Sequence, residues 1–234
     1  MARFTFTLLV SAALAILSSV NALPYGSESL GLNSTQLRDL ELATAITEVQ
    51  RQQLLMPNDF VFDFLNPPSG VATGDGGKLV SANAANFPAL IGHGVAMTIG
   101  YLGPCGINLP HTHLRATEII YIVQGKFETG FFQENGAVFV MNTVEKGMAT
   151  IFPQGSIHFQ QNLDCEDAIF VAAFNNEDPG VSTIDTNFIG GLPAEIVGSA
   201  LGNLGIKEAD DLKKYVPKNP AIGIEECRKR CNLH

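Results

Sequence analysis

Three histidines and one glutamate, in two short stretches, constrain this chain more than any other feature of its 234 residues. The first stretch holds His111, His113 and Glu118, and the second, about forty residues later, holds His158. Imidazole and carboxylate groups are metal ligands, so the four residues form a candidate metal-binding set. Because the ligands come from separate segments, they need a closed and rigid β scaffold to hold them together.

The spacing of the first three residues predicts their local backbone. Alternate side chains of an extended chain point to one face, so His111 and His113 can reach a metal from one strand. Glu118 has the opposite parity, which requires a turn or bulge between residues 114 and 117. Residues 118–123 are rich in β-branched and aromatic side chains and predict a strand.

The fourth residue of the set arrives on another predicted strand. The segment 147–153 leads into a Pro-x-Gly turn that redirects the chain, and His158 begins the strand that follows. Short apolar segments with regular turns continue from about residue 95 to 174, a pattern that predicts a jelly roll. The predicted strands are 96–102, 118–123, 126–132, 137–142, 149–152, 158–161 and 168–174.

Helical patterns flank these strands. Apolar residues recur every three to four positions between Thr35 and Leu55, which predicts one helix with a buried stripe. The segment 60–77 contains two adjacent prolines and several glycines, and is predicted to wrap the barrel irregularly. After residues 178–180, further helices are predicted at 194–201, with Pro193 in the first turn, and at 208–216.

The two stretches resemble the two cupin motifs. The pattern His-x-His-x4-Glu-x6-Gly is matched by His111, His113, Glu118 and Gly125. The pattern Gly-x5-Pro-x-Gly-x2-His-x3-Asn is matched by Gly147, Pro153, Gly155, His158 and Asn162. Residues 108–118 are similar to the germin box, and the layout from roughly residue 30 to 220 resembles the spherulins and their fungal relatives. Cys105 stands where the first motif usually opens with glycine.

This resemblance implies an all-β fold, a jelly-roll cupin barrel with N- and C-terminal α-helices. It also implies one Mn(II) held by His111, His113, Glu118 and His158. Ligand chemistry alone leaves the metal open: imidazoles suit Zn, Cu, Fe or Ni, whereas a carboxylate with open water positions favours a harder ion such as Mn. His93 and His234 have no partners at ligand spacing and are interpreted as ordinary loop or terminal residues.

The chain is expected to be secreted, with one barrel domain. An apolar run followed by small residues indicates a signal peptide at 1–22, and no later stretch approaches twenty apolar residues. The expected divisions are 1–22 for the signal peptide, 23–77 for the N-terminal helix and wrapping segment, 78–185 for the cupin barrel, and 186–234 for the C-terminal helical extension. The expected location is extracellular, including a cell wall or matrix.

Charge excludes some classes of partner. The formal net charge is −9, and no cluster of lysine or arginine lies along the barrel segments. Binding to nucleic acid or to a membrane is therefore not expected. Terminal helices on a single barrel can bury their apolar sides against a second subunit, and germin-like proteins assemble as dimers and trimers of dimers, so a homo-oligomer is predicted.

Four cysteines in a secreted chain favour two disulfides, for which three pairings exist. Cys105 precedes the first motif and Cys165 follows the second, so the predicted bonds are Cys105–Cys165 and Cys227–Cys231. The sequence Asn33-Ser34-Thr35 is a glycosylation sequon, and Asn33 serves equally well as a helix N-cap.

The resemblance implies a small anion or oxygen species as the substrate. Germins include oxalate oxidases, and many germin-like proteins show superoxide dismutase activity. Of the two asparagines that oxalate oxidase places near its metal, one matches Asn108 but the other aligns with Thr98, so superoxide dismutation is favoured. Asn108, Thr98 and Gln160 are candidate polar groups around the metal. The alternative is a non-catalytic extracellular protein, structural or stress-related like the spherulins, which would use the same four ligands.

Overall fold

The computed structural model describes residues 31–233, and the chain divides into two compact units between Leu54 and Leu55. The expected signal peptide at 1–22 and His234 lie outside the described residues. All four candidate metal ligands belong to the second unit.

Two short helices form the described part of the first unit, α1 (Ser34–Thr44) and α2 (Glu48–Gln53). Both begin with a capping box, in which the side chain of the cap and that of the third helical residue bond each other's backbone N–H. In α1 the cap is Asn33, whose side chain accepts a hydrogen bond from the N–H of Gln36 at 2.9 Å. The N-cap interpretation of Asn33 is therefore confirmed.

The single helix predicted over residues 35–55 is wrong. Ala45 has an extended backbone that ends α1, and Thr47 caps a new helix. The predicted buried stripe is also wrong, since Ile46 and Val49 are exposed and Leu42 is the buried residue of α1. Apolar spacing did not show that a threonine able to cap a helix interrupts the pattern.

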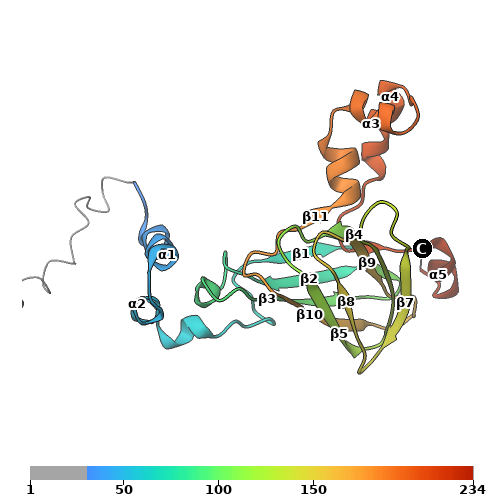
Figure 1. Ribbon diagram of the computed structural model, residues 1–234. Coiled ribbons are helices and arrows are strands. Elements are labelled where there is room, and N and C mark those ends of the chain that lie inside the picture. Colours follow the sequence, from blue (N-terminus) through green and yellow to red (C-terminus); the bar gives the residue numbers. More distant parts are fainter. Residues whose placement is uncertain (1–30, 234) are drawn as a thin grey trace, which may run out of the picture. The chain divides into compact units, whose positions relative to one another are not determined.

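Two antiparallel sheets form the jelly roll of the second unit (Figure 1). The first sheet has the strand order β1 (Val71–Gly74), β2 (Gly77–Ala82), β3 (Ala96–Leu102), β10 (Ala168–Phe174), β5 (Glu118–Gln124) and β8 (Ala149–Phe152). The second has the order β11 (Ser182–Thr183), β4 (Gly106–Thr112), β9 (Ile157–Gln161), β6 (Lys126–Phe132) and β7 (Val140–Glu145), with β12 (Ala221–Ile222) also paired to β4.

The barrel core follows from the alternation of side chains along these strands. In β10 every second residue is buried, and in β5 the buried residues are Glu118, Ile120 and Ile122. Phe127, Phe152 and Phe170 are among the largest fully buried side chains, and each contributes roughly 1.5–3 kcal/mol of hydrophobic stabilisation. Glu118 therefore points into the barrel on the same face as the core isoleucines.

The strand predictions are confirmed in most of the barrel. The bounds of β3, β6, β8 and β10 are those predicted, and β5 and β9 differ by one residue at one end. The strand predicted at 137–142 begins three residues later, at Val140, because residues 134–137 form a turn. The segment predicted to be irregular, residues 60–77, begins at the last residue of a 3₁₀ helix (Pro57–Phe60) and contains β1.

The C-terminal part of the chain returns to the barrel after a helical excursion. The helices α3 (Ala194–Ala200) and α4 (Ile206–Asp211) pack against each other, and a 3₁₀ helix (Leu212–Tyr215) follows (Figure 1). The chain then forms β12 along β4 and ends in α5 (Glu225–Arg230). None of the described helices combines the length and the apolar character needed to cross a membrane.

The predicted disulfide pairing is wrong, although all four cysteines are bonded. The bonds are Cys105–Cys227 and Cys165–Cys231, with Cα–Cα distances of 5.7 and 5.3 Å. The loops of Cys105 and Cys165 do lie side by side, since the N–H of Cys105 donates to Asp164 O at 3.2 Å. However, α5 remains a formed helix. Cys227 within it and Cys231 directly after it therefore each bond a cysteine of a different loop, and not each other.

Candidate metal centre

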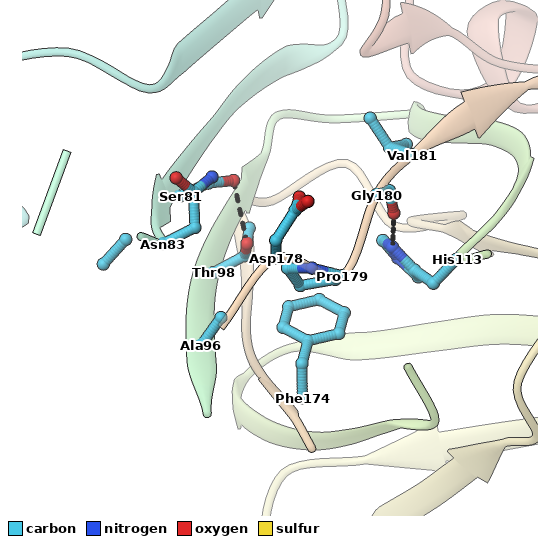
Figure 2. Close-up of a pocket in the computed structure, with 11 residues that line it drawn as sticks. Ser81, Asn83, Ala96, Thr98, His113, Phe174, Asp178, Pro179, Gly180 and Val181 are labelled. Atoms are coloured by element: carbon cyan, nitrogen blue, oxygen red, sulfur yellow. Dashed lines mark hydrogen bonds between the residues drawn. The ribbon is translucent and has the colours of Figure 1, made fainter. Parts of the chain in front are cut away.

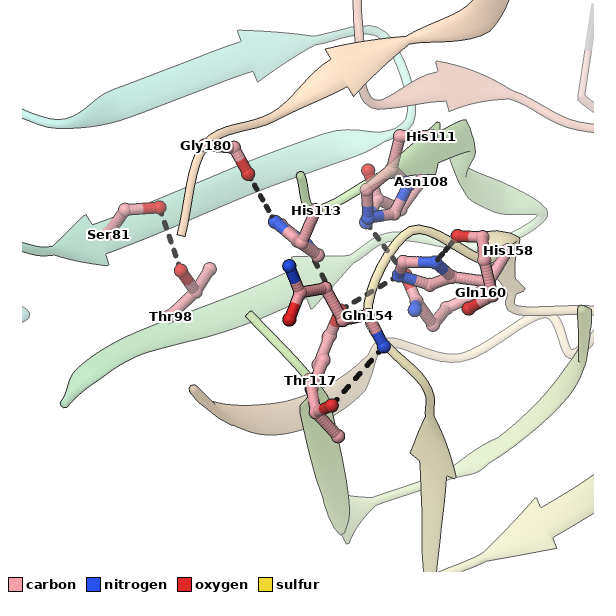
Figure 3. A network of polar contacts seen from close by, with 12 residues as sticks. Ser81, Thr98, Asn108, His111, His113, Thr117, Gln154, His158, Gln160 and Gly180 are labelled. Carbon is pink, nitrogen blue, oxygen red and sulfur yellow. Dashed lines mark hydrogen bonds and ion pairs between the residues drawn. The ribbon is translucent and has the colours of Figure 1, made fainter. Parts of the chain in front are cut away.

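Two of the candidate ligands face each other across neighbouring strands. His111 lies near the end of β4, directly opposite His158 in β9, and His113 follows one residue after β4 ends. The pairing of β4 with β9 has a register irregularity between Asn108 and His111. Figure 3 shows the three imidazoles gathered at this point. The two cupin motifs therefore meet in the middle of the second sheet.

The fourth ligand comes from the opposite sheet. After His113 the chain bends at residues 114–115, and Glu118 then opens β5 with its side chain turned inward. The N–H of Gly155 donates to His113 O at 3.0 Å, which joins the turn of the second motif to the bend of the first. The turn predicted between residues 114 and 117 is therefore confirmed, and it brings Glu118 to the histidines.

The four side chains converge on one point. One ligand atom from each of His111, His113, Glu118 and His158 lies within 4.8 Å of the others. Glu118 Oε2 lies 3.0 Å from His113 Nε2 and 2.8 Å from His158 Nε2. All four residues are buried, and even the most exposed, His113, retains only 9% of its accessible surface. This compact, buried arrangement is able to hold a metal ion.

Backbone carbonyls orient all three imidazoles. The Nδ1 atoms of His111, His113 and His158 lie 2.7, 2.6 and 3.0 Å from the carbonyl oxygens of Leu109, Gly180 and Ser156 respectively. A carbonyl oxygen only accepts, so each Nδ1 carries the proton and donates. With this proton on Nδ1, the Nε2 of a neutral imidazole has its lone pair available for a metal at the centre of the cluster. Metal-bound histidines have this outer arrangement, so the residues present fit a metal ion.

The electrostatics of the site favour a neutral His111 and an ionised Glu118. Burial is the main cause that lowers the pKa of His111 to about 3, and the neighbouring His158 acts in the same direction. Burial by itself raises the pKa of Glu118, but contacts with His113 and His158 outweigh it and hold that pKa below its usual range. These are the protonation states in which these two side chains bind a metal.

Aromatic rings limit the freedom of two ligands. The ring of Phe152 is stacked on His158 at 4.3 Å between centroids, and Phe174 contacts the ring of His113 edge-on at 4.6 Å. Both phenylalanines belong to the buried core. The imidazole planes are therefore held by packing as well as by the carbonyls.

An ion pair fixes the loop that supplies the carbonyl of Gly180. Arg115 Nη2 lies 2.8 Å from Asp178 Oδ1, Arg115 Nε donates to Asp178 O at 2.8 Å, and the N–H of Arg115 donates to Pro179 O at 3.0 Å. These bonds connect the residues just after His113 with the chain just after β10. The loop that orients His113 is thus tied to the motif that contains it.

A cavity of about 240 Å³ lies against the candidate ligands. Its apolar wall includes Leu79, Phe170, Phe174 and Val181. A second cavity of about 270 Å³ shares Ser81, Thr98, His113, Phe174 and Val181 with the first and continues toward Asp178 (Figure 2). Among the described residues, the lining of the first cavity contains no lysine or arginine, and its titratable residues are His111, His113 and Glu118.

The three predicted polar neighbours occupy different places. Thr98 and Asn108 line the cavity, and the hydroxyl of Thr98 is hydrogen bonded to that of Ser81 at 2.8 Å. Gln160 is fully buried behind Asn108 and accepts a hydrogen bond from its Nδ2 at 2.7 Å (Figure 3). Gln160 therefore contacts Asn108 and is not among the residues that line the cavity.

Sequence reasoning missed Asn219, which also lines the cavity. It precedes β12, and its Nδ2 donates to Asn108 Oδ1 at 2.8 Å. The only local signal in the sequence is an Asn-Pro dipeptide, which indicates a turn and nothing more. The path of the C-terminal chain along β4 brings Asn219 to the site.

The remaining motif residues have structural roles. Cys105 has a φ of 55°, a left-handed conformation that glycine adopts more easily, and this explains the usual glycine at that position. Asn162 is fully buried, and its side chain donates to Gly103 O and Glu166 O at 2.9 and 2.7 Å. It thereby ties together the two loops that carry Cys105 and Cys165.

Comparisons with known proteins agree with this geometry. The family described as Cupin matches residues 62–206. Spherulin-1A of Physarum polycephalum is 56% identical over 193 residues, which are 82% of this chain and 78% of that protein. Germin-like protein subfamily 2 member 4 of Arabidopsis thaliana is 34% identical over 165 residues, 69% of this chain and 74% of that protein. A solved structure of oxalate oxidase has a TM-score of 0.56 at 25% identity, covering 74% of this chain and 83% of that chain.

Proposed function

Because the chain belongs to the cupin family, with spherulins and germin-like proteins among its relatives, we propose that it binds Mn(II) and acts as an oxidoreductase on a small oxygen species. The observation that carries this proposal is the buried set of three Nε2 atoms and one carboxylate beside a small cavity. Manganese is supported by the donor set, in which a carboxylate accompanies the imidazoles, and by the resemblance to germins.

The bound metal would supply a redox centre that alternates between two oxidation states. The chain's own residues hold and shield it. His111, His113 and His158 are oriented by carbonyls, and Glu118 supplies the negative charge. The apolar wall of Leu79, Phe170 and Phe174 limits the number of hydrogen bonds that water can make in the cavity, so a small anion that enters meets less competition from water. Asn108 offers such an anion a polar contact inside the cavity.

Superoxide dismutation is favoured over oxalate oxidation. Among the described residues that line the cavity, none is a lysine or arginine that could neutralise a dicarboxylate. Thr98, which aligns with the second asparagine of oxalate oxidase, is engaged with Ser81 and has no amide to offer. Superoxide is diatomic and singly charged, so it requires less charge neutralisation and fewer hydrogen-bonding groups from the cavity than oxalate does.

The competing function is non-catalytic, that of an extracellular structural or stress-related protein. The 56% identity to spherulin-1A supports this alternative. The same four residues would then hold a metal that stabilises the barrel, because a metal bound only by the folded state raises the free energy of unfolding.

Elemental analysis by plasma mass spectrometry of protein purified without chelators tests the metal. We expect about one Mn per chain, since the described ligands form one four-residue site. A superoxide assay then compares the wild type with His113→Ala. Loss of activity at an unchanged melting temperature supports catalysis, whereas a large loss of stability with no wild-type activity supports the structural alternative. Absence of metal from a folded wild type would refute both metal-dependent functions.

Secretion and self-association belong to the same proposal. Two disulfides support an oxidising compartment, and the exposed Asn33 remains a candidate glycan site there. Ile119 and Ile151 are cross-strand partners on the outer face of the first sheet and are both about half exposed, which supports a homo-oligomer. Light scattering that shows only a monomer would refute the oligomer.

A further inference from the structure

Three side-chain amides and one backbone N–H form a continuous chain of hydrogen bonds beside the metal centre, here named the amide relay. The N–H of Leu109 donates to Asn219 Oδ1 at 2.8 Å, and Asn219 Nδ2 donates to Asn108 Oδ1 at 2.8 Å. Asn108 Nδ2 then donates to Gln160 Oε1 at 2.7 Å (Figure 3). Asn108 and Asn219 line the cavity, whereas Gln160 lies behind them.

The direction of the relay is set at one end. An amide side chain can be turned either way, but a backbone N–H can only donate. The N–H of Leu109 therefore requires Oδ1 of Asn219 to face it, which leaves Nδ2 of Asn219 to donate to Asn108. If the relay ran in the opposite direction, the nitrogen of Asn219 would face the N–H of Leu109, and two donors would meet.

This direction leaves a buried hydrogen-bond donor without an acceptor at the other end of the relay. Gln160 Nε2 is buried and has no hydrogen-bond partner within the described chain. A buried unsatisfied donor costs roughly 1–3 kcal/mol. Reversal of the relay would place this nitrogen against Asn108 Oδ1 and satisfy it, so the backbone N–H of Leu109 overrides the preference of Gln160.

We infer that Asn219 is a positioning residue that makes Asn108 present an N–H to the cavity, and that the site thereby selects a small oxyanion that accepts a hydrogen bond. Asn108 Nδ2 has two protons, and Gln160 takes one of them. Among the described residues nothing accepts the second. The choice of ligand rests on the proposed function, because the anion would share the cavity with the metal ligands.

The segment that carries Asn219 is well anchored. We name residues 218–223 the C-terminal strap. Its Pro220 O accepts a hydrogen bond from the N–H of Gly76 at 3.0 Å, and β12 pairs with Gly106 and Ile107 of β4. A Cβ on Gly76 would lie 1.8 Å from Ala221 O, so the strap and the turn between β1 and β2 are in direct backbone contact. The disulfide Cys105–Cys227 holds the chain just beyond the strap.

The first experiment measures formate binding to the Mn(II)-loaded full-length chain by electron paramagnetic resonance. Formate is a small oxyanion that accepts hydrogen bonds. We expect Asn219→Ala to weaken formate binding roughly 10-fold, in the range seen for groups that act on a site through another residue. Lys218→Ala, a matched change at an exposed strap residue, should leave the affinity unchanged.

A double-mutant cycle separates positioning from direct contact. If Asn219 acts through Asn108, then Asn219→Ala should change formate affinity less than about twofold in an Asn108→Ala background. An unchanged 10-fold effect in that background would overturn the inference. Equal formate affinity of the wild type and Asn219→Ala would overturn it as well.

A second variant keeps the fold and reverses the relay. In Asn219→Asp, one carboxylate oxygen still accepts from the N–H of Leu109, and the other accepts from Asn108. Asn108 must then turn its oxygen toward Gln160, whose free Nε2 can donate to it. In metal-free protein, the ¹⁵N side-chain amide resonances of Asn108 and Gln160 should shift in this variant and stay in place in Lys218→Ala.

The metal-free spectra distinguish failure of the inference from failure of the proposed function. If the wild type binds no manganese, the proposed function fails, and the amide spectrum decides alone whether Asn219 orients Asn108. Unchanged Asn108 resonances in Asn219→Asp would overturn the positioning role whether or not metal is bound.

Discussion

Removal of the Cys105–Cys227 disulfide should lower the free energy of unfolding without abolishing the fold. This bond spans 122 residues, and the second bond, Cys165–Cys231, spans 66. A disulfide stabilises mainly by restricting the unfolded chain, and the effect grows with the logarithm of the loop that it closes. The perturbation is the double substitution Cys105→Ala and Cys227→Ala.

The magnitude follows from how the two bonds are interleaved. While Cys165–Cys231 is intact, Cys227 stays close to Cys165 in the unfolded chain. The segment freed by the substitution is then the stretch between Cys105 and Cys165, about 60 residues, for which the chain-entropy relation gives about 4 kcal/mol. The same reasoning gives a similar or slightly smaller loss for Cys165→Ala with Cys231→Ala.

Urea unfolding of metal-free, non-reduced protein, followed by circular dichroism, measures this loss. The slope of the free energy against urea should also rise, because a less restricted unfolded chain exposes more surface. The two double variants serve as controls for each other, since each keeps one bond. A loss below about 1 kcal/mol in both variants, with an unchanged slope, would refute the unfolded-state reasoning.

Three further predictions concern the centre, the core and the strap. The lowered pKa of His111 in the folded state means that the unfolded chain binds more protons below pH 6.5. The free energy of unfolding of metal-free protein should therefore fall as the pH drops from about 6.5 toward 3. Urea midpoints that stay constant from pH 7 to 4 would contradict this prediction. Phe170→Ala should lower the free energy of unfolding, measured by thermal unfolding, by about 3–5 kcal/mol. In Gly100→Ala the new Cβ would lie 2.2 Å from the Phe170 ring, so this substitution should destabilise the wild type more than it destabilises the Phe170→Ala variant. Gly76→Ala should push Ala221, and the strap with it, away from the turn between β1 and β2 and lower the melting temperature; an unchanged melting temperature would show that the backbone contact is not required.

The sequence was informative where short spacings determine geometry. The parity of His111, His113 and Glu118 correctly predicted a bend between the second and third ligands, because strand alternation is a local property. The barrel strands could also be predicted from the sequence, since strands such as β10 bury alternate side chains in one core. The sequence did not predict that Phe152 and Phe174 pack on the imidazoles, because this packing depends on contacts between strands that are distant in the sequence.

Errors arose where distant segments decide the outcome. The predicted disulfides assumed that Cys227 pairs with Cys231 close to it in the sequence, and that Cys105 pairs with Cys165 where the two motifs meet. Instead, Cys227 and Cys231 at the end of the chain bond the two loops that carry Cys105 and Cys165. Asn219 is more than a hundred positions from Asn108 along the chain, so spacing carries no information about their contact. Both features depend on where the C-terminal chain returns to the barrel.

That return makes the metal centre depend on chain segments outside the barrel strands. The proton positions on the imidazoles are set by backbone carbonyls, which side-chain substitutions leave in place, and one of these carbonyls belongs to Gly180 in the loop after β10. The polarity of Asn108 is set by Asn219 in the strap. Changes that displace the loop or the strap should therefore disturb the centre even when all four ligands are retained, whereas a side-chain change elsewhere on the barrel surface should not.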